Sequence, residues 1–175
     1  MTAFLEEGLG LGPAIDGDLI VRPTLDSLRA GVGADKPLVL GATDDEFSMV
    51  LAGQEKKLRW IPLWMLFGKM GVKGTLRSAY LAANGDVVRR GHAAMLGRYL
   101  TDRMFRTAVV RTAEARGVAP TWVYRYEYAG SPFGSAVHCI DVPFWFDCLD
   151  SPVGIPALAG PNPPQALADA THGAA

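Results

Sequence analysis

Two segments of the chain carry the hydrophobic patterns of β-strands. Residues 36–42, Lys-Pro-Leu-Val-Leu-Gly-Ala, form a short apolar run between turn-forming residues. Such a run is typical of a strand buried on both faces of a parallel sheet, although periodicity alone also allows a core helix. Residues 122–128, Trp-Val-Tyr-Arg-Tyr-Glu-Tyr, alternate with period two and are rich in strand-forming side chains. We therefore predict a strand at each position.

Helical patterns occupy much of the chain between these two runs. The clearest covers residues 101–116, where Thr101 or Asp102 can cap the helix and Gly117 ends it. Its predicted apolar stripe consists of Phe105, Ala108, Val109 and Ala113. Residues 22–30 predict a shorter helix. Residues 46–81 predict several helices, interrupted at Pro62, Gly68, Gly71 and Gly74.

The two ends of the chain are more irregular. Residues 13–21 favour a short hairpin that turns at Asp16-Gly17. Residues 151–164 are rich in Pro and Gly, and a helical pattern then starts at Ala166. The helix over 101–116 and the strand after it form an αβ unit, so the pattern as a whole indicates an α/β fold.

Composition narrows the class of protein. Hydrophobic residues make up 49% of the chain and charged residues 20%, as in a globular protein, and the formal net charge is -1. This balance leaves no electrostatic footprint for nucleic acid, and no basic run suggests an anionic membrane surface. The apolar stretch near residues 60–67 is interrupted by Pro62 and is far shorter than the roughly 20 residues of a membrane span.

The N-terminal residues and the cysteine content both bear on the expected compartment. Residues 1–12 lack the basic start and apolar core of a signal peptide. The two cysteines, Cys139 and Cys148, have no metal-ligand spacing and are too few for a disulfide framework, which favours a reducing compartment. We therefore expect a cytoplasmic protein.

Candidate chemistry follows each predicted strand. Glu46 lies in the turn after the first strand, and His138 lies in a Gly- and Ser-rich loop after the second. Ligands of open parallel sheets bind beyond the carboxyl ends of the strands, so both residues are placed for catalysis. An acid followed by a histidine is also the chain order of an α/β-hydrolase triad. Taken singly, a Glu in such a turn is more often a solvated loop residue.

Four blocks of sequence together resemble the type-B carboxylesterases, the family that includes the cholinesterases. Residues 12–18 are similar to the segment before that family's catalytic-acid strand, and residues 38–47, LVLGATDDEF, to the strand and its G-x-x-x-D-E turn. Residues 101–105, TDRMF, are similar to the start of the helix before its last main strand. Residues 134–146, GSAVHCIDVPFWF, are similar to the block around its catalytic histidine.

The resemblance implies a partial α/β-hydrolase fold, the C-terminal part of a mainly parallel sheet with flanking helices, and assigns roles to three residues. Glu46 would be the triad acid, His138 the general base, and Asp141 a nearby supporting carboxylate. The chain departs from the family at two of these places. Phe47 stands where many members have Gly, so the local turn is in doubt, and Asp141 stands where Glu is common.

The serine nucleophile of the family is missing from these 175 residues. No Gly-x-Ser-x-Gly occurs, because Gly130-Ser131-Pro132-Phe133-Gly134 has its serine one place too early, and the His-Gly-Gly-Gly type of oxyanion segment is absent. We expect residues 1–175 to be a single partial domain, an internal or C-terminal piece of a catalytic domain, in which 151–175 holds a tail and the start of a truncated helix. The isolated chain would lack esterase activity and would expose sheet edges that a complementary N-terminal chain carrying the serine should cover.

Further expectations concern the substrate and the rival functions. The substrate of the intact enzyme would be a small-molecule ester, with no cofactor, metal, nucleic acid or membrane involved. Trp60, Trp64, Phe67 and Met70 are candidates for a hydrophobic substrate pocket, although such a cluster at helical spacing is more often core. A non-catalytic interaction module and a truncated gene product remain alternatives. A metal-dependent hydrolase using Asp44, Asp45, Glu46 and His138 is a weaker one, since adjacent carboxylates do not converge on one ion without strain.

Overall fold

The computed structural model describes residues 13–152 and 154–174. Its sheet has two strands, β1 (Leu38–Thr43) and β2 (Thr121–Tyr126), which pair in parallel from Leu38↔Thr121 to Thr43↔Tyr126. Both strands were predicted within two residues of these bounds. The expected burial of β1 on both faces holds only near its carboxyl end, because Val39 is 41% exposed whereas Ala42 and Thr43 are buried.

The peptide groups of β1 point alternately to its two edges. The amides of Leu38 and Asp44 donate to the carbonyls of Pro120 and Tyr126. Because alternate residues of a parallel strand bond to the same neighbour, the even-numbered residues of β1 pair with β2 and the odd-numbered ones point to the opposite edge. Within the described residues no strand pairs with that opposite edge.

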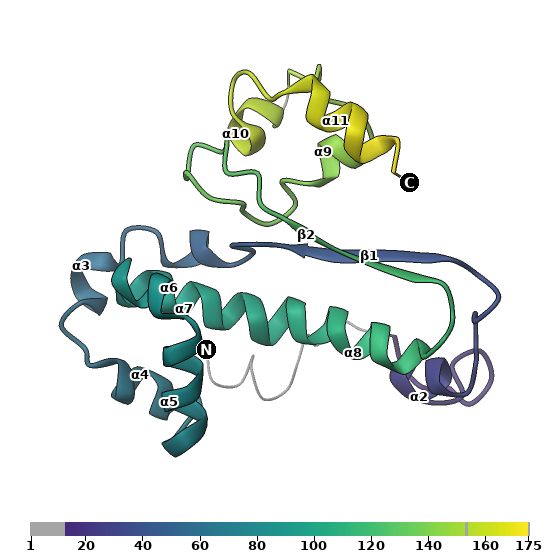
Figure 1. Ribbon diagram of the computed structural model, residues 1–175, viewed down its shortest axis with the longest axis horizontal. Coiled ribbons are helices and arrows are strands. Elements are labelled where there is room, and N and C mark those ends of the chain that lie inside the picture. Colours follow the sequence, from purple (N-terminus) through teal and green to yellow (C-terminus); the bar gives the residue numbers. More distant parts are fainter. Residues whose placement is uncertain (1–12, 153, 175) are drawn as a thin grey trace.

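One long helical rod supports the sheet. It consists of α7 (His92–Thr101), a five-residue π-helical segment η2 (Asp102–Arg106), and α8 (Thr107–Arg116), which follow one another directly. Figure 1 shows the rod running alongside both strands. The predicted start at Thr101 or Asp102 was wrong, because the helix begins after Gly91, whose φ of 110° only glycine adopts readily. Its predicted end at Gly117 is confirmed.

Short helices fill the segment between β1 and the rod. They are η1 (Ser48–Leu51), α3 (Glu55–Leu58), α4 (Leu63–Lys69), α5 (Gly74–Ala83) and α6 (Gly85–Arg89). The predicted breaks at Pro62, Gly71 and Gly74 are confirmed, whereas Gly68 lies inside α4. A core of Phe67, Val87, Met95 and Tyr99, with their neighbours, joins these helices to α7.

The C-terminal helices cover the other side of the sheet (Figure 1). They are α9 (Val142–Trp145), α10 (Ile155–Ala159) and α11 (Gln165–His172), of which only the last was predicted. Their core contains Tyr126, Val137, Ile140 and Phe144 and packs against Tyr124 and Tyr128. The alternating tyrosines of β2 therefore form the strand face that meets this core.

A close approach between the strands explains one glycine of β1. A Cβ atom on Gly41 would collide with the ring of Tyr124 and with its backbone carbonyl. The Tyr124 ring therefore lies over Gly41, in space that any side chain at position 41 would fill.

The predicted hairpin over residues 13–21 was wrong. These residues form no strand, and the Asp16 carboxylate instead accepts hydrogen bonds from the amides of Asp18 and Ile20. The Asp-Gly pair therefore makes a local turn without strands. The helix predicted to follow is confirmed as α2 (Thr24–Arg29).

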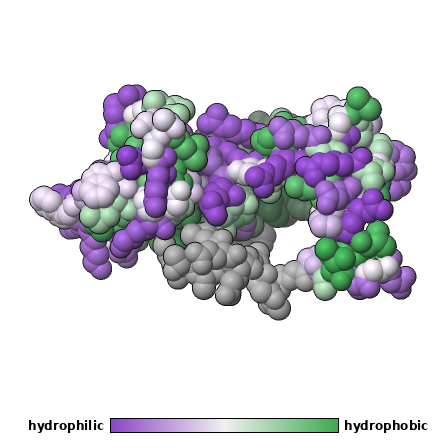
Figure 2. Space-filling view, turned by 90° about the horizontal axis from the view of Figure 1, so that it is seen from below, coloured by the Kyte–Doolittle hydropathy of each residue, from purple (hydrophilic) through white to green (hydrophobic). Residues whose placement is uncertain are grey.

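Apolar side chains remain on the surface of the described residues. Trp122 and Val123 at the start of β2 are more than half exposed, and so are Ile15, Leu19 and Val21 before α2. Figure 2 shows a green, apolar group at the end of the molecule that carries α2. None of the helices in the described part is long and apolar enough to cross a bilayer.

Candidate active site

Glu46 and His138 meet at the carboxyl end of the strand pair. The Nδ1 atom of His138 lies 2.5 Å from Oε2 of Glu46, although the two residues are far apart in sequence. The Glu46 side chain is 7% exposed and that of His138 is 47% exposed. The carboxylate is thus held inside the protein while the imidazole reaches toward the surface.

Backbone contacts fix the position of the Glu46 carboxylate. Its second oxygen, Oε1, accepts a hydrogen bond of 2.8 Å from the amide of Thr43, the last residue of β1. The amide of the neighbouring Asp45 donates to the carbonyl of Ala136, which ties the turn to the loop that carries His138. Both oxygens of Glu46 are therefore bonded, and the acid is oriented before any substrate arrives.

The contact with Glu46 determines how His138 can act. A carboxylate only accepts hydrogen bonds, so Nδ1 carries a proton and Nε2 of the neutral ring is the acceptor. The ring lies near the aromatic rings of Phe105, at 5.3 Å between centroids, and Phe47, at 6.3 Å. Phe105 belongs to the π-helical segment of the rod, and such segments are frequent at functional sites.

The local turn accommodates Phe47 where the related family often has glycine. Phe47 has φ −117° and ψ 11°, a conformation open to residues with a side chain. Its amide donates to the hydroxyl of the buried Thr101, 3.4 Å away, and its ring contacts Phe105. The departure from glycine therefore leaves the Glu46 turn intact.

Asp44, next to the candidate acid, serves a different purpose. Its carboxylate contacts Arg106 and Arg125 at 2.5–2.7 Å, and the buried Arg98 at 3.7 Å. Burial raises the pKa of Asp44, but the hydrogen bond from Arg125 and the charges of the three arginines outweigh burial and hold the pKa below its ordinary value. Asp44 thus pins β1 and β2 to the helical rod.

Asp141 lies at the start of α9 and bonds to β2. It accepts a hydrogen bond of 2.8 Å from the hydroxyl of Tyr124. Burial and this hydrogen bond raise the pKa of Tyr124. Asp141 follows His138 closely in the chain, so its hydrogen bond to Tyr124 ties the end of the His138 loop to β2.

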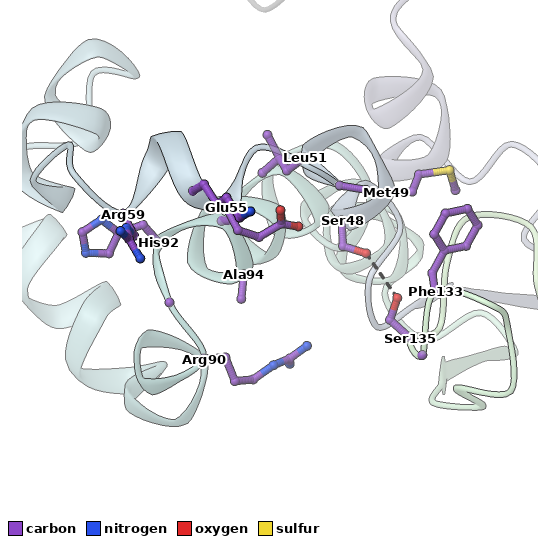
Figure 3. A pocket seen from close by; sticks show the side chains of 15 residues that line it. Ser48, Met49, Leu51, Glu55, Arg59, Arg90, His92, Ala94, Phe133 and Ser135 are labelled. Atoms are coloured by element: carbon purple, nitrogen blue, oxygen red, sulfur yellow. Dashed lines mark hydrogen bonds between the residues drawn. The ribbon is translucent and has the colours of Figure 1, made fainter.

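A cavity of about 480 Å³ is lined by residues that follow Glu46 and precede His138 in the chain, although neither member of the candidate pair lines it. Two serines meet at one end of it, Ser48 after the Glu46 turn and Ser135 before His138, with their hydroxyl oxygens 3.5 Å apart. Figure 3 shows Met49 and Phe133 beside them and Arg59 and His92 at the other end. The cavity thus has two hydroxyls and two apolar side chains at the end near the His138 loop, and basic or ionisable side chains at its far end.

The four predicted substrate-pocket residues are spread over two environments. Phe67 is fully buried in the core between α4 and α7, and Met70 packs against that core. Trp60 is 75% exposed beneath the guanidinium of Arg59, and Trp64, 59% exposed, lines a shallow pocket on α4 and α5. None of the four is among the residues that line the cavity beside Ser48.

The acidic residues of the turn point apart. Asp44 faces the arginines and Glu46 faces His138, so these carboxylates do not converge on a common point. In the described part of the chain, no three His, Cys, Asp or Glu side chains cluster as metal ligands would.

A parallel strand pair backed by helices, with an acid and a histidine beyond its carboxyl ends, defines the C-terminal part of an α/β-hydrolase. The chain belongs to the carboxylesterase family, whose model matches residues 2–152. It is 28% identical over 173 residues to the phenmedipham hydrolase of Pseudarthrobacter oxydans, covering 93% of this chain and 33% of that protein.

Solved carboxylesterases share the fold. The Geobacillus stearothermophilus carboxylesterase EST55 at pH 6.2 superposes with a TM-score of 0.65 at 25% identity, covering 98% of this chain and 37% of that chain. Its structure at pH 6.8 gives a TM-score of 0.61 at 26% identity, with 98% and 35% covered. The chain therefore spans about a third of the length of the relatives it matches.

Sequence reasoning missed the contacts that support the pair. The Thr43 amide carries no side-chain signal, and the arginine cluster draws on positions spread from Arg98 to Arg125. The position of Phe105 opposite His138 depends on the π-helical segment, which has no pattern of its own. Arg98 alone carried a hint, because a charge stood within the apolar pattern of α7.

Proposed function

We propose that this chain supplies the acid and the general base of a serine hydrolase that cleaves carboxylic esters. The observation that carries the proposal is the 2.5 Å contact between His138 Nδ1 and the buried Glu46. The contact fixes the tautomer in which Nε2 is free to take a proton. Membership of the carboxylesterase family supports ester hydrolysis as the reaction.

The two residues would divide the work as in other serine hydrolases. His138 Nε2 takes the proton of a serine hydroxyl as its oxygen attacks the ester carbonyl, and then returns the proton to the leaving alcohol. Glu46 holds the ring and stabilises the imidazolium that forms, without being protonated itself. Asp141, through Tyr124, acts as a positioning residue for the His138 loop.

The serine must come from outside these 175 residues, because they contain no Gly-x-Ser-x-Gly. We infer that a complementary segment, N-terminal in the family order, supplies the nucleophile and the oxyanion donors. Loss of a triad serine lowers turnover by about a millionfold in a well-studied protease, and what remains there comes from the oxyanion hole and binding. We therefore expect the chain by itself to be inactive.

Turnover of a short p-nitrophenyl ester tests the expected inactivity of the isolated chain. The isolated chain and its His138→Ala variant should hydrolyse the ester at the same background rate. A higher rate in the parent chain that His138→Ala abolishes would show a nucleophile within these residues and overturn the inactivity.

Complementation tests the catalytic roles. Addition of a separately produced segment with the serine and oxyanion loop, such as the matching portion of the Geobacillus carboxylesterase, should restore turnover. His138→Ala should remove it, and Glu46→Gln should lower it by about ten-thousandfold, since the wrong tautomer is then favoured. His92→Ala is the matched control, because His92 bonds to the Leu58 carbonyl away from the pair. Full turnover with Glu46→Gln would refute the role of the acid.

The cytoplasm is the proposed location. Cys139 and Cys148 are both free thiols, which fits a reducing compartment. Cell fractionation with an antibody against the chain checks this, and recovery from a secreted fraction would contradict it.

A further inference from the structure

Helices α4 and α5 present an exposed surface of mixed apolar and basic side chains. Together they line a shallow pocket of about 440 Å³ whose lining residues, which we call the basic aromatic surface, are Trp64, Met65, Gly68, Lys69, Lys73 and Arg77. In Figure 1, α4 and α5 lie on the far side of α7 from the two strands. The surface is therefore separate from the catalytic loop and from the open edges of the sheet.

The apolar part of this surface is not needed for the fold of α4. The helix buries Phe67 completely and packs Leu63 and Leu66 against the same core, so its inner face is already apolar. Trp64 and Met65 point the other way, and Trp64 is more than half exposed. Trp64 and Met65 are therefore available on the outer face of α4 for contact with a partner.

The basic side chains of this surface have no acidic partner in the described part of the chain to balance their charge. Within the described residues, no ion pair is formed by Lys69, Lys73 or Arg77, whereas the arginines around Asp44 are paired. The chain as a whole has a net charge of -1. Between residues 55 and 90, however, the only acidic residues are Glu55 and Asp86, and the basic ones are Lys56, Lys57, Arg59, Lys69, Lys73, Arg77, Arg89 and Arg90.

A second tryptophan adjoins this segment. Trp60, just before α4, is mostly exposed, with the guanidinium of Arg59 4.6 Å from its ring centroid. Exposed tryptophans together with basic side chains are typical of protein segments that lie at the boundary between lipid headgroups and acyl chains. Indole rings suit that boundary because they are apolar with one polar N–H, and the cations pair with lipid phosphates.

We propose that the basic aromatic surface docks the protein on an anionic phospholipid bilayer. Trp64 and Met65 enter the headgroup region, while Lys69, Lys73 and Arg77 pair with lipid phosphates. The sequence predicted no membrane contact because its basic residues form no continuous run, but the fold of α4 and α5 gathers them on one surface. The docking requires no membrane span and does not depend on the proposed catalytic roles.

Vesicle sedimentation with the full chain tests the proposal. The chain should bind vesicles of phosphatidylcholine mixed with phosphatidylglycerol and should not bind vesicles of phosphatidylcholine alone. Each basic side chain near an anionic surface strengthens binding about fivefold. The triple variant K69Q/K73Q/R77Q should therefore bind about a hundredfold more weakly, and Trp64→Ala should also weaken binding without lowering the melting temperature.

A matched variant distinguishes docking from general charge attraction. R22Q/R29Q/K36Q removes the same charge from exposed residues around α2, at the other end of the molecule, and should keep vesicle binding. Equal losses in both triple variants would overturn the proposal. So would unchanged binding with Trp64→Ala, or binding to single-stranded nucleic acid of the same charge with none to the vesicles.

Discussion

The two ends of the strand pair differ in how completely the chain surrounds them. At the carboxyl end, Thr43 and Tyr126 are buried and both oxygens of Glu46 are bonded. At the amino end, Val39 and Trp122 lie exposed although their types suit a covered sheet. The acid–histidine pair is thus formed within the described residues, and the exposed amino end fits the proposal that a complementary segment covers the rest of the sheet.

The largest effect should come from the core behind the His138 loop. Phe144 is fully buried against Tyr126 and Tyr128. Phe144→Ala should lower the free energy of unfolding in urea by about 4 kcal/mol, because it leaves a cavity. Phe146→Ala, two residues away and 73% exposed, should change it by less than about 1 kcal/mol. Equal losses would mean that the carboxyl end is no better packed than the surface.

A smaller but still large effect should follow Gly41→Ala in the middle of β1. The added methyl group meets both the ring and the carbonyl of Tyr124, so the strands must separate, at a cost of about 3 kcal/mol. Gly68→Ala is the matched control, since nothing lies within 4 Å of its added Cβ, and alanine favours the helix by about 1 kcal/mol. Urea unfolding of both variants measures the difference.

Asp44→Asn should destabilise the fold by about 2 kcal/mol at neutral pH, because it leaves the buried Arg98 without its counter-charge and Arg106 with Asp102 alone. The folded pKa of Asp44 is lowered, so its stabilisation is present above the ordinary pKa of 3.8 and is lost as the pH falls through the folded value. The difference between the parent chain and the variant should therefore shrink below about pH 4. A difference that is constant with pH would contradict the charge cluster.

The smallest effect is expected at the amino end of the sheet. Val39→Thr should alter the free energy of unfolding by less than about 0.5 kcal/mol, because the side chain is partly exposed already. In the presence of the complementary segment proposed above, the same substitution should become costly. Equilibrium unfolding with and without that segment measures the change.

These residues also show what a sequence can and cannot predict. Glu46 and His138 were identifiable because each follows a strand and because four blocks resemble one family. The hairpin at Asp16 failed because an Asp-Gly pair specifies a turn, while strand pairing depends on partners that residues 13–21 lack. Periodicity placed Trp64 and Phe67 on one helix, but spacing alone does not reveal which side a neighbouring helix covers.

The amide of Thr43 limits how the sheet can grow. As an odd-numbered residue of β1, Thr43 directs this N–H toward the open edge, where the Glu46 carboxylate already occupies it. An incoming strand can therefore hydrogen-bond alongside Val39 and Gly41 but must diverge before reaching Thr43. An added strand and the Glu46 carboxylate would compete for the same Thr43 N–H. Strand pairing must therefore stop before Thr43, which leaves the carboxyl end of β1 open around Glu46 and His138.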